Sequence, residues 1–132
     1  MLTHVDHEID TGTVVFKVIG NIIISQVKPF IDVAPRQVDE LKSVVDEYID
    51  GDFGFVSTRF KDSEISINPM VWEYVFSMLP NMKAFALVTN SEMGKDNFLE
   101  TEKPMIENFK NNFPANVFPS VDEAYNWIVD QL

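Results

Sequence analysis

The chain has 132 residues, and its 21 Asp and Glu residues against 10 Lys and Arg residues give a formal net charge of −11. This length matches one domain, and a composition that is 45% hydrophobic can fill a buried core, so we expect residues 1–132 to form a single domain. So large a negative charge repels phosphate backbones, which excludes nucleic acids as expected partners, and the lack of cysteine excludes disulfides, thiolate nucleophiles and cysteine-bound metals.

Short β-type patterns begin the chain. Residues 2–10 predict a weak strand, and Thr13–Ile19, which is rich in β-branched and aromatic residues, predicts a stronger one. Gly20-Asn21 then interrupts the pattern. Ile22–Ser25 is therefore either a short continuation of that strand or the second strand of a hairpin. The most apolar stretch, Val14–Ile24, is about half as long as the ~20 residues that a membrane span requires, so we expect no membrane span.

Two helices and a strand are predicted in the middle of the chain. Pro35 suits the first turn of a helix and Asp50-Gly51 suits its end, so we expect a helix between them. Phe53–Phe60 predicts the next strand. Asn68-Pro69 then predicts the cap and first turn of a second helix, over residues 70–79.

The last part of the chain continues this alternation. Ala84–Val88 is continuously apolar, as a strand covered on both faces tends to be. We expect Thr101 to cap a helix, Ala115–Phe118 to form a short strand, and Ser120 with Glu123 to form the capping box of a last helix. Alternating strands and helices predict an α/β fold with a single-layer, mainly parallel, mixed sheet and about four helices. The helix after Thr101 would carry Met105, Ile106, Phe109 and Phe113.

Groups that could carry catalysis or bind a metal ion are scarce. The two histidines, His4 and His7, lie in a strand-like or frayed segment, where residues three apart point to opposite faces. The chain has no Gly-x-Ser-x-Gly motif, and Gly94-Lys95 lacks the other residues of a phosphate-binding loop. We therefore expect no enzyme activity, no metal site and no cofactor. The first ten residues are polar and acidic, unlike a secretory leader, so we expect a cytoplasmic protein.

The helix predicted over residues 70–79 carries more apolar residues than one buried face needs. At about 100° per residue, Trp72 lies on the flank of its buried face, and Met70 and Phe76 fall beside its polar stripe. Either neighbouring loops cover Met70 and Phe76, or these residues belong to a partner surface, a dimer contact or the wall of an apolar pocket.

The loop ahead of this helix offers candidate phosphorylation sites. Residues 61–69 bring Asp62, Ser63 and Ser66 close to the N-terminus of a helix, where a phosphate would be stabilised. The alternative interpretation is a polar loop that ends in a helix cap.

The order of elements and the closing motif resemble a known family. A strand that ends at Gly20, followed by alternating helices and strands, resembles the STAS domain, and more narrowly the small stand-alone SpoIIAA-like (STAS/SEC14-like) proteins. That group commonly ends with a short strand and a small-x-x-Glu-Ala-x-x-Trp-Leu helix, which Ser120–Ile128 (SVDEAYNWI) resembles. The resemblance covers the whole chain and implies one SpoIIAA/STAS-like sandwich domain.

The resemblance also implies functions. STAS domains that antagonise anti-sigma factors carry Asp-x-Ser-Gly before the second helix, and a partner kinase phosphorylates that serine. This chain has Asp62-Ser63-Glu64 without the glycine, so Ser63 and Ser66 match the motif only in part. The SEC14 side of the resemblance implies a lipid or another apolar ligand between the sheet and the helices.

Two functional hypotheses follow. The leading one is a non-enzymatic regulatory or protein-interaction module whose residues 70–79 form an apolar contact surface for a protein partner or a second copy. The rival is a module that binds a small apolar or lipid-like ligand in a pocket between sheet and helices. The expected walls of that pocket are Trp72, Phe98, Met105 and Phe109.

Overall fold

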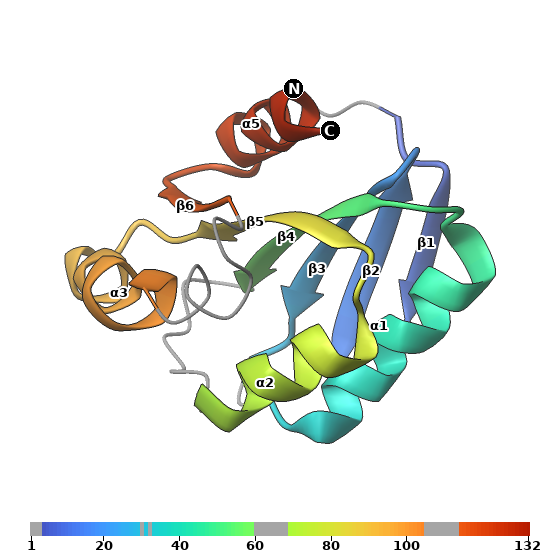
Figure 1. Cartoon of the computed structure of the whole chain (residues 1–132), viewed down its shortest axis with the longest axis horizontal. Coiled ribbons are helices and arrows are strands. Elements are labelled where there is room, and N and C mark those ends of the chain that lie inside the picture. The colour runs from blue at the N-terminus through green and yellow to red at the C-terminus, as the bar shows by residue number, and fades with distance from the viewer. Residues whose placement is uncertain (1–3, 30, 32, 60–68, 105–113) are drawn as a thin grey trace.

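The computed structural model describes residues 4–29, 31, 33–59, 69–104 and 114–132. The described residues form one six-stranded sheet whose strands lie side by side in chain order, with helices on both faces (Figure 1). The predicted α/β class and single-layer mixed sheet are confirmed. The strands are β1 (His7–Asp10), β2 (Val14–Ile19), β3 (Ile22–Val27), β4 (Phe53–Arg59), β5 (Met82–Val88) and β6 (Ala115–Phe118). The helices are α1 (Pro35–Tyr48), α2 (Pro69–Met78), α3 (Glu92–Asn97), the π-helical segment η2 (Phe98–Glu102) and α5 (Val121–Gln131).

The first three strands form an antiparallel meander. β2 and β3 pair from Ile19 opposite Ile22 to Val14 opposite Val27, so the segment after Gly20 is the second strand of a hairpin. Gly20 has a φ of 57°, the left-handed conformation that glycine adopts most readily in a tight turn. β1 begins at His7, later than the strand predicted over residues 2–10.

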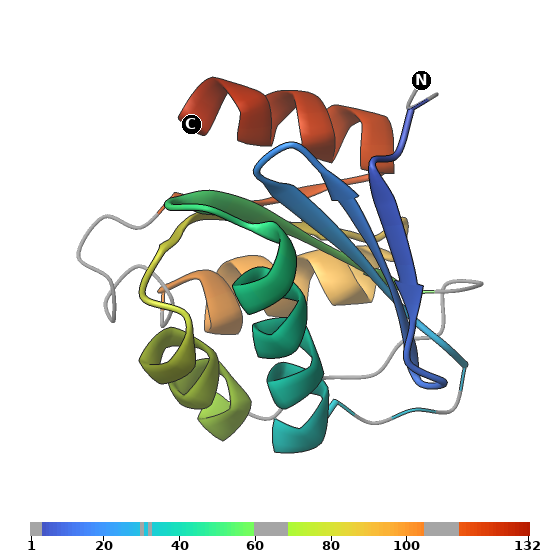
Figure 2. The ribbon, with the colours of Figure 1, turned by 90° about the vertical axis from the view of Figure 1, so that its right-hand side faces the viewer.

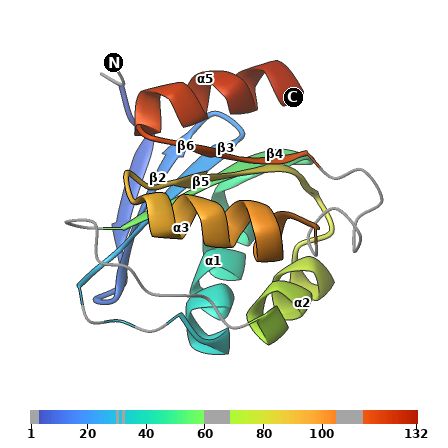
Figure 3. The ribbon, with the colours of Figure 1, turned by 90° about the vertical axis from the view of Figure 1, so that its left-hand side faces the viewer.

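The remaining strands extend the sheet in parallel. β3 pairs with β4, β4 with β5 and β5 with β6, all in the same direction. Parallel crossovers are almost always right-handed, and each new strand is added on the same side, so the crossover helices must share one face. Figures 2 and 3 show α1, α2 and α3 on that face and α5 on the opposite one.

Successive side chains of each strand point to opposite faces of the sheet, so the sheet has a hydrophobic core on each face. The core under α1 and α2 is built from large side chains, among them Phe16, Phe85 and Trp72. The core under α5 is thinner, because the fully buried residues that β5 contributes to it are Ala84 and Ala86, with Val88 partly buried at its edge. The strand predicted over residues 84–88 is part of β5, which begins earlier, at Met82. Ala84, Phe85 and Ala86 are fully buried, so this part of it is covered on both faces, and Leu87 and Val88 are partly buried.

The predicted helix ends are mostly confirmed. Pro35 is the first residue of α1, which ends at Tyr48, just before Asp50-Gly51. Ser120 caps α5, because its Oγ accepts a hydrogen bond from the backbone N–H of Glu123 at 3.2 Å. The strand at Ala115–Phe118 is confirmed with its predicted bounds.

The prediction that Thr101 caps a helix is wrong. Thr101 lies inside η2, and the helical segment begins earlier, at Glu92. The cap is Ser91, whose Oγ accepts a hydrogen bond from the backbone N–H of Gly94 at 3.1 Å and satisfies a first-turn donor. Met105 and Phe109 lie outside the described residues.

Candidate ligand-binding pocket

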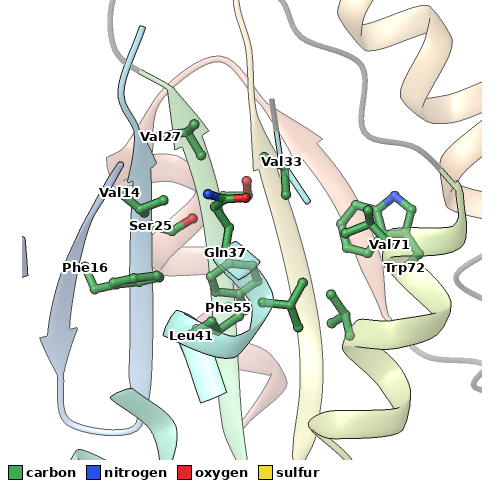
Figure 4. Close-up of a pocket in the computed structure, with 13 residues that line it drawn as sticks. Val14, Phe16, Ser25, Val27, Val33, Gln37, Leu41, Phe55, Val71 and Trp72 are labelled. Atoms are coloured by element: carbon green, nitrogen blue, oxygen red, sulfur yellow. The ribbon is translucent and has the colours of Figure 1, made fainter. Parts of the chain in front are cut away.

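A pocket of about 50 Å³ lies between the sheet and the two helices α1 and α2 (Figure 4). The strands β2, β3 and β4 form its floor, and α1 and α2 form its walls. In Figure 4, Val14 and Phe16 lie on one side of the pocket, and Val71 and Trp72 lie on the other. The lining residues are Val14, Phe16, Ser25, Val27, Val33, Gln37, Val38, Leu41, Phe55, Ser57, Val71, Trp72 and Val75.

Two serines interrupt the apolar floor of the pocket. Ser25 on β3 and Ser57 on β4 are paired neighbours in the parallel register, so both side chains point to the same face of the sheet. Each lies near the carboxyl end of its strand. In open α/β sheets, ligands bind beyond the carboxyl ends of parallel strands, so this position suits a ligand.

The polar groups of the pocket are buried and largely unused by the protein. Ser25 is 3% exposed and Ser57 is 7% exposed, and neither hydroxyl has a hydrogen-bond partner among the described residues. Gln37 is buried too, and its Oε1 accepts a hydrogen bond from the backbone N–H of Ala34 at 2.8 Å. The Gln37 Nε2 has no hydrogen-bond partner in the described part of the chain, so it remains a donor.

A hydrogen bond between α1 and α2 lies beside the pocket. The Tyr74 hydroxyl of α2 donates to Asp39 Oδ1 of α1 at 2.5 Å. This hydrogen bond to a carboxylate raises the pKa of Tyr74 above its ordinary value of 10.0. The bond joins the two helices that wall the pocket and holds them together at neutral pH.

The pocket has the chemistry of a binding site for a small neutral molecule. Among the described residues that line it, none is acidic, basic, histidine or tyrosine. Its volume equals that of a few water molecules at about 10–15 Å³ each, and it is smaller than the ~150 Å³ cavity known to hold benzene. A whole lipid chain therefore exceeds this volume, whereas the polar end of a small ligand fits it.

The structure separates the residues that the sequence proposed as one surface. Trp72 is 3% exposed and lines the pocket, where the sequence had predicted it on the edge of a helix. Phe98 is fully buried against Phe85, with ring centroids 6.1 Å apart, and does not line the pocket. Met70 is 72% exposed on α2. Ser63, Ser66, Met105, Phe109 and the side chain of Phe76 lie outside the described residues.

Sequence reasoning missed the three polar residues of the pocket. Ser25 follows three isoleucines, and Ser57 lies between valine and threonine in an apolar strand. The sequence does offer one signal for these serines, which is a serine at a strand position that faces the core. Because a buried hydroxyl normally has a hydrogen-bond partner, such a serine indicates a polar contact inside the protein. Gln37 had no comparable signal, because glutamine at the third position of a helix is also a common capping residue.

The described residues hold no group of three histidine, aspartate or glutamate side chains that could bind a metal ion. His4 Nε2 lies 2.7 Å from Asp6 Oδ1, and His7 stacks on Tyr48 with ring centroids 4.4 Å apart, so the two histidines have different surroundings. No helix within the described ranges has the length and apolar character needed to cross a membrane.

Comparisons with family models, with curated proteins and with solved structures give no match to this chain.

Proposed function

We propose that this protein is a non-enzymatic regulatory module that binds a small, mainly apolar molecule carrying one hydrogen-bond acceptor. The observation that carries the proposal is a pair of buried serine residues, Ser25 and Ser57, that line an otherwise apolar pocket and whose hydroxyls form no hydrogen bond with any described residue. Hydroxyls that line a small apolar pocket without a protein partner are free to donate to a ligand. A ligand acceptor that receives these hydrogen bonds is held in a fixed orientation.

The lining chemistry supports a neutral ligand. A charged group that enters an apolar pocket loses its hydration and needs an opposite charge in compensation, and none of the described lining residues supplies one. The hydroxyls and the Gln37 Nε2 donate to a carbonyl or ether oxygen, and Trp72 and Phe55 pack against its apolar part.

The same lining argues against catalysis. General acid–base chemistry and covalent catalysis need a titratable side chain or an activated nucleophile. Within the part of the lining that the structure describes, neither serine has a histidine or another base beside it. The resemblance to STAS/SEC14-like proteins agrees with ligand binding between sheet and helices and with a regulatory role, and that assignment remains part of the proposal.

The test uses acetone and isobutene, which have the same shape but differ in the acceptor oxygen. In a titration followed by two-dimensional ¹H–¹⁵N NMR, we expect acetone to shift the amide resonances of Ser25 and Ser57 saturably. We expect isobutene to bind about tenfold more weakly, the effect of one lost hydrogen bond of about 1.4 kcal/mol. Native mass spectrometry of gently purified protein then searches for the natural ligand.

Two variants and a control make this test specific. Ser57→Ala removes one hydroxyl, and Ser25→Val removes the other and also fills part of the pocket, so both weaken acetone binding. Valine is in addition a good β-forming residue, which preserves β3. Ser43→Val, on the exposed face of α1, is the matched control and leaves binding unchanged. Equal affinity for both probes, or no saturable shift at the pocket, contradicts the proposal.

A further inference from the structure

A second hollow lies on the opposite face of the sheet, beside the N-terminus of α5. Its volume is about 300 Å³, which is within the lower range of small-molecule sites. Apolar walls alternate in it with polar groups, and three strands contribute side chains. We call it the α5 groove. Its lining residues are Val5, Lys17, Ile19, Ile24, Gln26, Thr58, Ser120, Val121 and Asp122.

The α5 groove and the pocket share two strands. Gln26 and Thr58 are paired neighbours on β3 and β4, one residue after Ser25 and Ser57. Because successive side chains of a strand point to opposite faces, one polar pair lines the pocket and the next lines the α5 groove. The two sites are therefore separate, with different residues and different chemistry.

Thr58 is the polar group that indicates a ligand in the α5 groove. The residue is 8% exposed, and it lines the groove. The Thr58 hydroxyl has no hydrogen-bond partner within the described ranges of the chain. A hydroxyl on a buried residue that lines a hollow of this size and has no described protein partner is suited to bind a ligand.

The groups around Thr58 are mainly hydrogen-bond donors. Lys17, half-buried on β2, forms no ion pair with any described residue, although Glu8 is its neighbour across the β1–β2 ladder. The backbone N–H of Val121 belongs to the first turn of α5, where helix donors lack partners inside the helix and the helix dipole is positive. The Gln26 amide also faces the groove.

We propose that the α5 groove binds a small monocarboxylate with a short branched apolar body. Lys17, Thr58 and the first-turn N–H of Val121 donate to the carboxylate, and Ile19 and Ile24 pack against the apolar body. Asp122 also lines the groove and, with the net charge of −11, repels anions in proportion to their charge, so a doubly charged anion is disfavoured more than a singly charged one. A single carboxylate therefore suits the groove better than a phosphate.

The probe for this site is isovalerate, compared with its neutral analogue isovaleramide and with inorganic phosphate. In ¹H–¹⁵N NMR titrations of the full chain, isovalerate shifts the amide resonances of Thr58, Gln26 and Val121 saturably. Isovaleramide and phosphate each bind at least about tenfold more weakly than isovalerate. Isovaleramide lacks the negative charge, and phosphate carries more negative charge than a monocarboxylate. Equal binding of either comparison compound overturns the assignment of a monocarboxylate.

Matched lysine variants identify the groove as the site. Lys17→Met weakens isovalerate binding about tenfold, whereas Lys83→Met, at an exposed lysine on β5, leaves it unchanged. Thr58→Val keeps the shape of the side chain and also weakens binding. The proposal is overturned if Lys17→Met and Thr58→Val bind isovalerate as tightly as the control Lys83→Met does, or if the protein shows no saturable binding at all. Acetone binding at Ser25 and Ser57 does not affect this result, so the two sites are tested independently.

Discussion

At the scale of single residues, Asp6 attaches the N-terminal segment to the β2–β3 hairpin. Its Oδ2 accepts a hydrogen bond from the backbone N–H of Gly20 at 2.8 Å, and its Oδ1 lies 2.7 Å from His4 Nε2. The Gly20 hydrogen bond and, next, the His4 hydrogen bond hold the pKa of Asp6 below its ordinary value of 3.8. The charged form of Asp6 is therefore favoured by the fold.

This pKa shift gives the first stability prediction. A carboxyl whose folded pKa is lowered stabilises the protein fully above about pH 4 and loses that contribution as the pH falls through the folded pKa. We expect Asp6→Asn to lower Tm by about 1–3 °C at neutral pH, because the residue is exposed and its contribution is small. The difference from wild type disappears in strong acid.

Thermal unfolding followed by circular dichroism across an acid pH series measures this difference. Glu47→Gln, an equal change of charge on the exposed face of α1, is the control. A difference between wild type and Asp6→Asn that stays constant down to the most acidic pH would falsify the linkage.

At the scale of elements, the packing of α5 depends on small residues in the strands beneath it. Gly54 on β4 faces Ile128 of α5, and a Cβ added at Gly54 would lie 2.2 Å from Ile128 Cγ2. Ala84 and Ala86 on β5 are also fully buried under this helix. Ile128 is fully buried as well, so its methyl group has little room to move.

Gly54→Ala is therefore expected to destabilise the protein even though alanine usually stabilises a chain relative to glycine. The overpacking of a buried contact lowers the free energy of unfolding by about 1–3 kcal/mol. Ile128→Ala alone lowers it by about 2–5 kcal/mol, because it removes buried methyl groups and leaves a cavity.

The double variant tests whether the two residues are coupled. Because Ile128→Ala removes the clashing methyl group, the double variant is more stable than the sum of the single effects predicts. Denaturant unfolding of the wild type and the three variants measures this coupling. If the two single changes in the free energy of unfolding simply add in the double variant, the destabilisation by Gly54→Ala does not come from contact with Ile128.

At the scale of the whole molecule, self-association through α2 is the second candidate function, which we propose from the exposure of Met70. Of the described apolar residues of α2, Met70 is 72% exposed, whereas Trp72 is buried and belongs to the pocket. Each copy carries a net charge of −11, so two copies repel each other at low salt.

This candidate predicts a dimer whose fraction increases with salt, because salt screens the repulsion. Sedimentation velocity measures the dimer fraction. We expect Met70→Glu to lower the association constant of the dimer about tenfold, because it would bury a charge at the contact. Met93→Glu, at a methionine of α3 that is 75% exposed, is the control. A monomer at every salt concentration removes this candidate and leaves ligand binding unaffected.

The elements of the fold were predictable from the sequence because they depend on local patterns. The β-branched and aromatic residues of β2 and β4, Pro35 at the start of α1 and Ser120 before α5 each identify an element through its own backbone and side-chain preferences. The start of α3 was missed because two capping residues, Ser91 and Thr101, competed for one helix. Only the tertiary structure identifies Ser91.

The sequence by itself determined the α/β class, the order of the elements and the acidic surface, since these follow from composition and short-range periodicity. Only the tertiary structure decided that Ser25 and Ser57 lie side by side under α1 and α2, and that Trp72 joins them there. Strand register and helix packing join residues more than 30 positions apart in the chain, and no local pattern encodes that distance. The physical reason is that secondary structure is selected locally, whereas a pocket is formed by the packing of several elements at once.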